Sequence, residues 1–162
     1  VPERIASLVT CSTGFQGSAI TNLEGWSSVI AREGMAGWSR MMMPLRFDEV
    51  QVDAGLYRWF DQEQAKARAH VVLEQAALLA GADLTADLPK ISVPVLSLVP
   101  TGSPFVSVEA GQHIHAAVQG SEIAYFPGVK HALISSHPRL CAETVASFYE
   151  RRTGKRAGDE DQ

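Results

Sequence analysis

Three short apolar runs along the chain predict buried β-strands. They cover residues 5–10, 93–99 and 121–126, and each run is followed by a cluster of turn-forming residues. Continuous apolar runs of this length are typical of strands in a parallel sheet, in which both faces are covered. Pro94 lies near the start of the second run, where a strand tolerates proline. We therefore expect a parallel sheet of three strands.

Two helices are expected to accompany this sheet. Residues 108–118, between the second and third runs, and residues 137–151, after the third, both carry apolar side chains at helical spacing. Strands that alternate with helices over short links imply an α/β fold with parallel strands and right-handed crossovers. Four apolar residues of the second helix are expected to face the core: Leu140, Val145, Phe148 and Tyr149.

The first and second runs are separated by roughly eighty residues, far more than a crossover of about a dozen residues requires. This segment predicts an all-helical insertion, or lid. Its expected helices cover residues 19–32, ending at the C-cap Gly34, residues 35–43, stopping at Pro44, residues 54–80, with a break near Asp61, and residues 84–88.

These elements divide the chain into three parts. The sheet and its helices form a core of residues 1–14 and 89–152, and the helices between them form the lid of residues 15–88. Residues 153–162 are polar and charged, and we expect this tail to be disordered. A length of 162 residues suits one globular domain with a real core.

The order of these elements resembles the C-terminal half of α/β-hydrolases, and three stretches of the core and one of the lid carry the resemblance. Residues 2–9 (PERIASLV) look like the approach to the strand after the nucleophile helix. Residues 92–96 (SVPVL) resemble the strand after the lid, and residues 126–132 (FPGVKHA) are similar to the turn that presents the catalytic histidine. Residues 25–37 (GWSSVIAREGMAG) look like the lid of 3-oxoadipate enol-lactonases. The resemblance implies three parallel strands with flanking helices, an all-helical lid, and a hydrolase of small carboxylic esters or enol-lactones.

The resemblance also implies where catalysis takes place. In α/β-hydrolases a nucleophile, usually Ser in Gly-x-Ser-x-Gly, is activated by a His that an Asp or Glu holds, in that chain order. The sequence contains no Gly-x-Ser-x-Gly, so the nucleophile and the oxyanion-hole donors are expected outside this chain. His131 follows the third strand in the place of the catalytic histidine, where it would act as general base at the carboxyl edge of the sheet. This chemistry needs no cofactor.

The acid position departs from the family pattern. The turn after the second strand reads PTGSP over residues 100–104, and Ser103 stands where the family has Asp. A hydroxyl can orient the histidine but cannot stabilise an imidazolium as a carboxylate does, and losing that charge costs several orders of magnitude in rate. Glu109 is an alternative acid about one helical turn further on. The other alternative is a catalytically inactive, hydrolase-like binding or assembly protein, and a lyase or oxygenase that uses the histidine alone is a third.

Large apolar side chains in the lid are candidates for a substrate pocket. Trp26, Met35, Trp38 and Met42 could line it, and packing between the lid and the sheet is their alternative role. Met42 belongs to the adjacent methionines 41–43, which cannot all face one core, and methionine suits adaptable binding surfaces. His113 and His115 lie on opposite sides of a helix, so we expect no metal site.

Composition and charge narrow the choice of partners. The formal net charge of −4 gives no basic face, which argues against nucleic acid. No apolar run approaches the roughly 20 residues that span a bilayer, and we expect no membrane partner. Cys11 and Cys141 lie far apart and favour a reduced, cytoplasmic protein. Because the chain opens on Val1 instead of methionine, we expect a processed product, a fragment or a truncated chain.

The first strand is expected to leave one sheet edge open. An apolar strand without a neighbour invites pairing with another chain. We therefore expect a partner at this edge, either the N-terminal half of the hydrolase or a second copy of the chain.

Overall fold

The computed structural model describes residues 4–23 and 25–153. Residues 1–3, 24 and 154–162 lie outside the described residues, and with them most of the tail expected at residues 153–162. Within the described part of the chain, no helix is both long and apolar enough to cross a membrane.

The three expected strands form one parallel sheet. They are β1 (Leu8–Cys11), β2 (Val95–Pro100) and β3 (Glu122–Phe126), in the order β1-β2-β3. β1 begins at Leu8 instead of residue 5. The Leu8 amide donates to the Pro94 carbonyl at 2.9 Å, but Pro94 has no N–H with which to continue the ladder toward the preceding residues. The proline therefore fixes where pairing begins.

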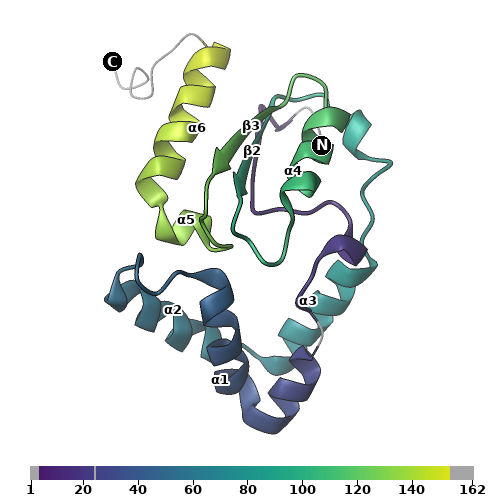
Figure 1. Cartoon of the computed structure of the whole chain (residues 1–162). Helices are drawn as coiled ribbons and strands as arrows, with labels where there is room; N and C mark the ends of the chain where they lie inside the picture. The colour runs from purple at the N-terminus through teal and green to yellow at the C-terminus, as the bar shows by residue number, and fades with distance from the viewer. Residues whose placement is uncertain (1–3, 24, 154–162) are drawn as a thin grey trace.

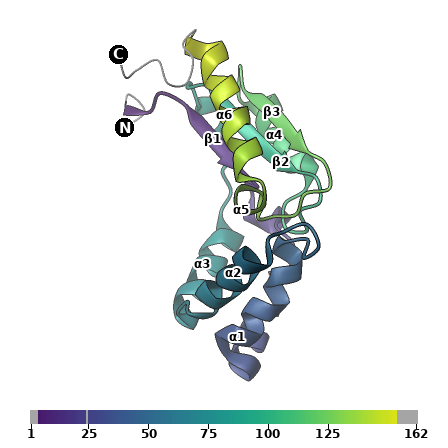
Figure 2. The same ribbon diagram turned by 90° about the vertical axis from the view of Figure 1, so that its left-hand side faces the viewer.

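Helices cover the two faces of the sheet (Figures 1 and 2). On one face α4 (Val108–Ala117) packs against β2, and Gly111 brings them so close that a Cβ there would lie 2.6 Å from a Val99 methyl. On the other face lie α5 (Leu133–Ser136) and α6 (Pro138–Thr153). Successive side chains of β2 point to opposite faces of the sheet and so contribute to the apolar core on each face. Leu96 and Leu98 pack with Phe126, Leu133, Cys141 and Phe148, and Val95 packs with Leu88, Ile114 and Val118.

The core-facing side of α6 differs in part from the prediction. Val145 and Phe148 do pack on the sheet, but Leu140 is 48% exposed and Tyr149 is 43% exposed. Cys141 takes the expected place of Leu140, because positions 141, 145 and 148 follow the i, i+4, i+7 stripe of a helix. The Tyr149 hydroxyl instead lies 2.7 Å from the Ser7 hydroxyl.

The helical insertion begins later than predicted. After the short 3-10 helix η2 (Gly17–Ala19), the long helix α1 (Trp26–Arg46) starts at Trp26 and not at residue 19. Gly34, at φ 68°, breaks α1 at the position expected for a C-cap. The helix also continues through Pro44 instead of stopping there. Proline costs the helix about 3 kcal/mol, and burial of Met42, Met43 and Phe47 around it offsets that cost.

The remainder of the insertion contains two helices and a 3-10 turn. They are α2 (Ala54–Ala65), α3 (Ala69–Gly81) and η3 (Leu88–Lys90). The break between α2 and α3 falls at residues 66–68 and not near Asp61, which lies inside α2 and accepts a hydrogen bond from the Ser39 hydroxyl of α1. A 3-10 turn replaces the helix expected at residues 84–88. The Gly17 amide donates to the Ala82 carbonyl at 2.7 Å and joins the start of the insertion to its end.

Replacing Phe148 by Ala tests the observed core. Phe148 is fully buried, so we expect its loss to lower the free energy of unfolding by about 3–5 kcal/mol. Urea denaturation measures this. The matched control is Leu140→Ala on the same helix, for which we expect a change below about 1 kcal/mol. Equal losses in the two variants would contradict the observed packing of α6.

Candidate functional site

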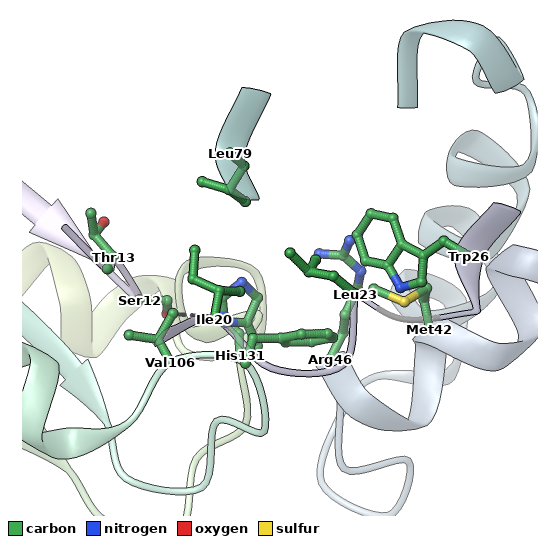
Figure 3. A pocket seen from close by; sticks show the side chains of 12 residues that line it. Ser12, Thr13, Ile20, Leu23, Trp26, Met42, Arg46, Leu79, Val106 and His131 are labelled. Carbon is green, nitrogen blue, oxygen red and sulfur yellow. Dashed lines mark hydrogen bonds between the residues drawn. The ribbon is translucent and has the colours of Figure 1, made fainter. Parts of the chain in front are cut away.

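A cleft of about 320 Å³ lies where the helical insertion meets the carboxyl ends of β1 and β2. Figure 3 shows it from close by, with Ser12, Thr13 and Val106 toward the sheet and Trp26 and Met42 toward the insertion. A volume of roughly 300–1,000 Å³ and a mainly apolar lining are typical of small-molecule sites. The lining residues are Ser12, Thr13, Gly14, Ile20, Leu23, Trp26, Met42, Arg46, Leu79, Phe105, Val106 and His131.

His131 enters this cleft because hydrogen bonds fix the loop that carries it. The loops after β2 and β3 are joined by the Gly102 amide, which donates to the Val129 carbonyl at 3.0 Å. The Ser12 hydroxyl donates to the His131 carbonyl at 2.8 Å, from the end of β1. The Ala132 amide donates to the Arg46 carbonyl at 3.0 Å, from the end of α1. The sheet, through Ser12, and the helical insertion, through Arg46, therefore both hold the histidine loop.

Ser103 is the polar partner of the His131 ring. Its Oγ lies 3.0 Å from His131 Nδ1. The same oxygen accepts hydrogen bonds from the backbone amides of Phe105 and Val106, both at 3.3 Å. A hydroxyl has two lone pairs and one proton. Since two amides occupy the lone pairs, the proton is the group left to meet Nδ1, and this arrangement favours the tautomer that carries its proton on Nε2.

No carboxylate among the described residues hydrogen-bonds to His131. Glu109, the alternative acid, is exposed at the start of α4. Hydrogen bonds from its own backbone amide and from Ser107 lower the pKa of its carboxyl. Glu109 therefore belongs to the cap of α4 and not to the histidine. The structure thus brings Ser103 beside His131 and offers no substitute acid in the part of the chain that it describes.

The surroundings of His131 disfavour its charged form. Burial lowers the pKa of His131 from 6.5 to about 4, and the positive charge of Arg46 acts in the same direction. The rings of Phe105 and His131 pack in a T-shaped arrangement, with a centroid distance of 4.8 Å. With no carboxylate to favour the imidazolium, the ring is neutral at pH 7.

Arg46 is a second polar group of the cleft, and it was not among the residues expected from the sequence. It ends α1, its guanidinium lies 5.8 Å from the centroid of the Phe60 ring, and burial lowers its pKa. Its Nε is buried without a hydrogen-bond partner. An isolated arginine within the apolar stretch of residues 41–47 was the signal available in the sequence.

The four lid candidates fall into two pairs. Trp26 and Met42 line the cleft together with His131. Met35, which is half-buried, and Trp38, which is 4% exposed, belong to the same apolar cluster but do not line the cleft. Of the other histidines, His113 stacks on Phe15 at 4.5 Å. No cluster of three or more metal-binding side chains occurs among the described residues.

Comparison with known proteins gives a fold. No family model matches the sequence, and no curated protein matches it. The structure is similar to the enol-lactonase from Burkholderia xenovorans LB400, with a TM-score of 0.80 and 20% identity over 91% of this chain and 57% of that one. It is also similar to a hydrolase from Pseudomonas aeruginosa PA01, with a TM-score of 0.78 and 21% identity over 92% of this chain and 57% of that one. A thermophilic esterase from Thermogutta terrifontis, with malate bound, gives a TM-score of 0.75 and 19% identity over 93% and 57% of the two chains.

These structural neighbours are α/β-hydrolases, and this chain spans about 57% of their length. The chain has the C-terminal part of the α/β-hydrolase fold, with three parallel strands and flanking helices, as predicted.

Replacing Ser103 by Asp tests the contact with His131. A carboxylate at this position stabilises the imidazolium, so we expect the pKa of His131 to rise above its value of about 4. Titration of the histidine ring followed by NMR measures it. Ser107→Asp is the matched control, because Asp also caps a helix and adds the same charge away from the ring. An unchanged pKa in Ser103→Asp would show that the hydroxyl and the ring are not in contact.

Proposed function

We propose that this chain is the C-terminal portion of an α/β-hydrolase that acts on a small carboxylic ester or enol-lactone. His131 is its catalytic-position histidine, and the nucleophile lies outside this chain. The observation that supports the proposal most is the position of the His131 ring. It lines an apolar cleft at the carboxyl edge of a parallel sheet, and Ser103 engages its Nδ1. Open α/β sheets bind ligands at this edge.

In this role His131 takes the proton of the nucleophile and returns it to the leaving group. A pKa of about 4 keeps the ring neutral at neutral pH, so that it is free to accept a proton, but it also makes the ring a weak base. Base catalysis through Nε2 needs the proton on Nδ1, so the Ser103 hydroxyl must turn to accept it. This rotation of the hydroxyl breaks at least one of the hydrogen bonds that Ser103 accepts from the backbone amides of Phe105 and Val106. This chemistry requires no cofactor.

One observation favours a second function. The two backbone amides that bond to Ser103 disfavour the His131 tautomer with its proton on Nδ1, which a base requires. No carboxylate of the described residues accepts a hydrogen bond from Nδ1 to favour that tautomer. A hydrolase-like protein that binds a small molecule but does not turn it over accounts for this arrangement. Activity of the full-length protein separates the two functions.

The open edge of β1 supports a partner for this chain. β1 pairs with β2 alone among the described strands, and Leu8 is 37% exposed. Beside it lies a large apolar groove between β1 and α6, lined among others by Val9, Cys11 and Val145. In the proposed function the N-terminal half of the hydrolase covers this edge, and without it a second copy of the chain pairs there.

We further propose a cytoplasmic protein. Its two cysteines, Cys11 and Cys141, lie far apart in the sequence and suggest no disulfide framework.

Hydrolysis of p-nitrophenyl butyrate by the full-length protein tests the proposed function. We expect measurable turnover that falls about 10²–10⁴-fold in His131→Ala, because the base is lost. We expect Ser103→Asp to raise kcat at least about tenfold, because a carboxylate supports the imidazolium. His70→Ala, at an exposed position of α3, is the control. No turnover, or turnover indifferent to His131→Ala, would favour the binding protein instead.

Light scattering after size-exclusion chromatography tests the open edge. We expect the 162-residue chain alone to elute as an associated species, and Leu8→Lys to shift it toward the monomer, because an edge lysine blocks strand pairing. Tyr125→Lys is the matched control, since Tyr125 is 43% exposed on β3, the opposite edge of the sheet. A stable, well-behaved monomer of the unaltered chain would defeat the proposal of a partner at this edge.

A further inference from the structure

Arg46 places a positive charge in a cleft whose other side chains are mostly apolar. It ends α1, and Figure 3 shows its guanidinium inside the cleft, close to Leu23 and Trp26. An arginine stem packs readily against apolar surface, but its head normally stays in water or pairs with an anion. Here the head faces the cleft and its Nε is sealed from solvent.

No acid of the described residues neutralises this charge. Arg46 forms no ion pair in that part of the chain, and its Nε has no hydrogen-bond acceptor. Two nearby carboxylates, Asp48 after the end of α1 and Asp61 on α2, are engaged elsewhere. Asp48 accepts from the Val50 amide and the Gln51 side chain, and Asp61 accepts from the Ser39 hydroxyl. A partly buried cation without a counter-charge is costly to the free protein, and such costs are typical of binding sites.

His131 supplies a second donor to the same cleft. Its Nδ1 is engaged by Ser103, so Nε2 is the nitrogen that remains for a ligand. The backbone amides that fill the lone pairs of Ser103 favour a proton on Nε2. The cleft thus presents a guanidinium and an N–H donor, and both suit the two oxygens of a carboxylate. Its remaining lining includes Ile20, Leu23 and Phe105, which suit an apolar chain.

The geometry points to a carboxylate subsite. We infer that the cleft takes a small apolar molecule that carries a free carboxylate, and that the carboxylate pairs with Arg46. The inference names the ligand class of the site in the proposed function. It rests on the cleft being the ligand site and not on hydrolysis, so the pairing with Arg46 holds for a hydrolase and for a binding protein alike. The Nε2 donor of His131 belongs to the binding protein, because a base needs Nε2 free of its proton.

Binding of butyrate to the 162-residue chain tests the inference. Butyrate carries the carboxylate and a short apolar chain, butyramide is its neutral counterpart, and inorganic phosphate is an anion without an apolar chain. NMR follows the Nε–H resonance of Arg46, which shifts when the guanidinium it belongs to pairs with an anion. We expect butyrate to shift that resonance with saturation, and butyramide and phosphate to bind at least about tenfold more weakly.

Variants of Arg46 separate a binding role from a structural one. We expect Arg46→Gln to weaken butyrate binding about 10- to 100-fold, because a charge-assisted hydrogen bond is lost, and Arg46→Lys to restore part of it. Arg40→Gln is the matched control, since Arg40 lies on the same helix with its side chain 64% exposed and pairs with Glu33. Circular dichroism checks that each variant is folded, and methyl resonances of Ile20 and Leu23 report binding where Arg46 is absent.

The outcomes are distinct from those of the esterase assay. Equal binding of butyrate and butyramide, equal binding of phosphate, or butyrate binding that survives Arg46→Gln unchanged overturns the carboxylate subsite. Butyrate binding through Arg46 in a full-length protein that hydrolyses no ester supports the subsite and removes only the hydrolase. Ester turnover without any butyrate binding removes the subsite and keeps the hydrolase.

Discussion

The site depends on the contact between the two loops that follow β2 and β3. Because these strands are parallel neighbours, their carboxyl ends lie side by side, and the Gly102 amide bonds to the Val129 carbonyl at 3.0 Å. A Cβ on Gly102 would lie only 2.6 Å from the Gly128 carbonyl oxygen, so the approach requires glycine. This contact brings Ser103 and His131, which are far apart in sequence, to 3.0 Å. Without it the histidine would be a residue of a surface loop.

A serine in place of a carboxylate changes the charge of the whole cleft. An Asp at position 103 would balance the positive charge of Arg46 and favour protonation of His131. With Ser103 the site holds a neutral imidazole, a neutral hydroxyl and one guanidinium. Burial and Arg46 both lower the pKa of His131 to about 4, so the ring does not add a second charge at pH 7. The cleft therefore carries net positive charge in an apolar setting, where electrostatic attraction to an anion is strong.

The sequence was sufficient for the strands and for the relation of Ser103 to His131, because both rest on local patterns. Apolar runs mark strands that are buried on both faces, and the two turns follow the strand ends directly. Residues that depend on tertiary packing were harder to predict. Met35 and Trp38 have the same character as Trp26 and Met42, and only the break at Gly34 and the direction of α1 decide which pair reaches the cleft. Leu140 was misplaced because a helix of alternating small and large residues fits two neighbouring stripes, and the position of the sheet selects the one through Cys141.

Arg46 shows most clearly why the site is a property of the packed molecule. Its carbonyl accepts the Ala132 amide at 3.0 Å, and the neighbouring Pro44 carbonyl accepts Lys130 Nζ at 2.7 Å. The end of α1 therefore bonds to the residues on both sides of His131. The carbonyls of Pro44 and Arg46 are available to this loop because they lie in the last turn of α1, where no further helical amide bonds to them. The residue whose backbone positions the histidine loop is thus the residue whose side chain charges the cleft. Any shift of α1 relative to the sheet moves the charge and the histidine together, so the helical insertion forms one wall of the site and is not only a cover over it.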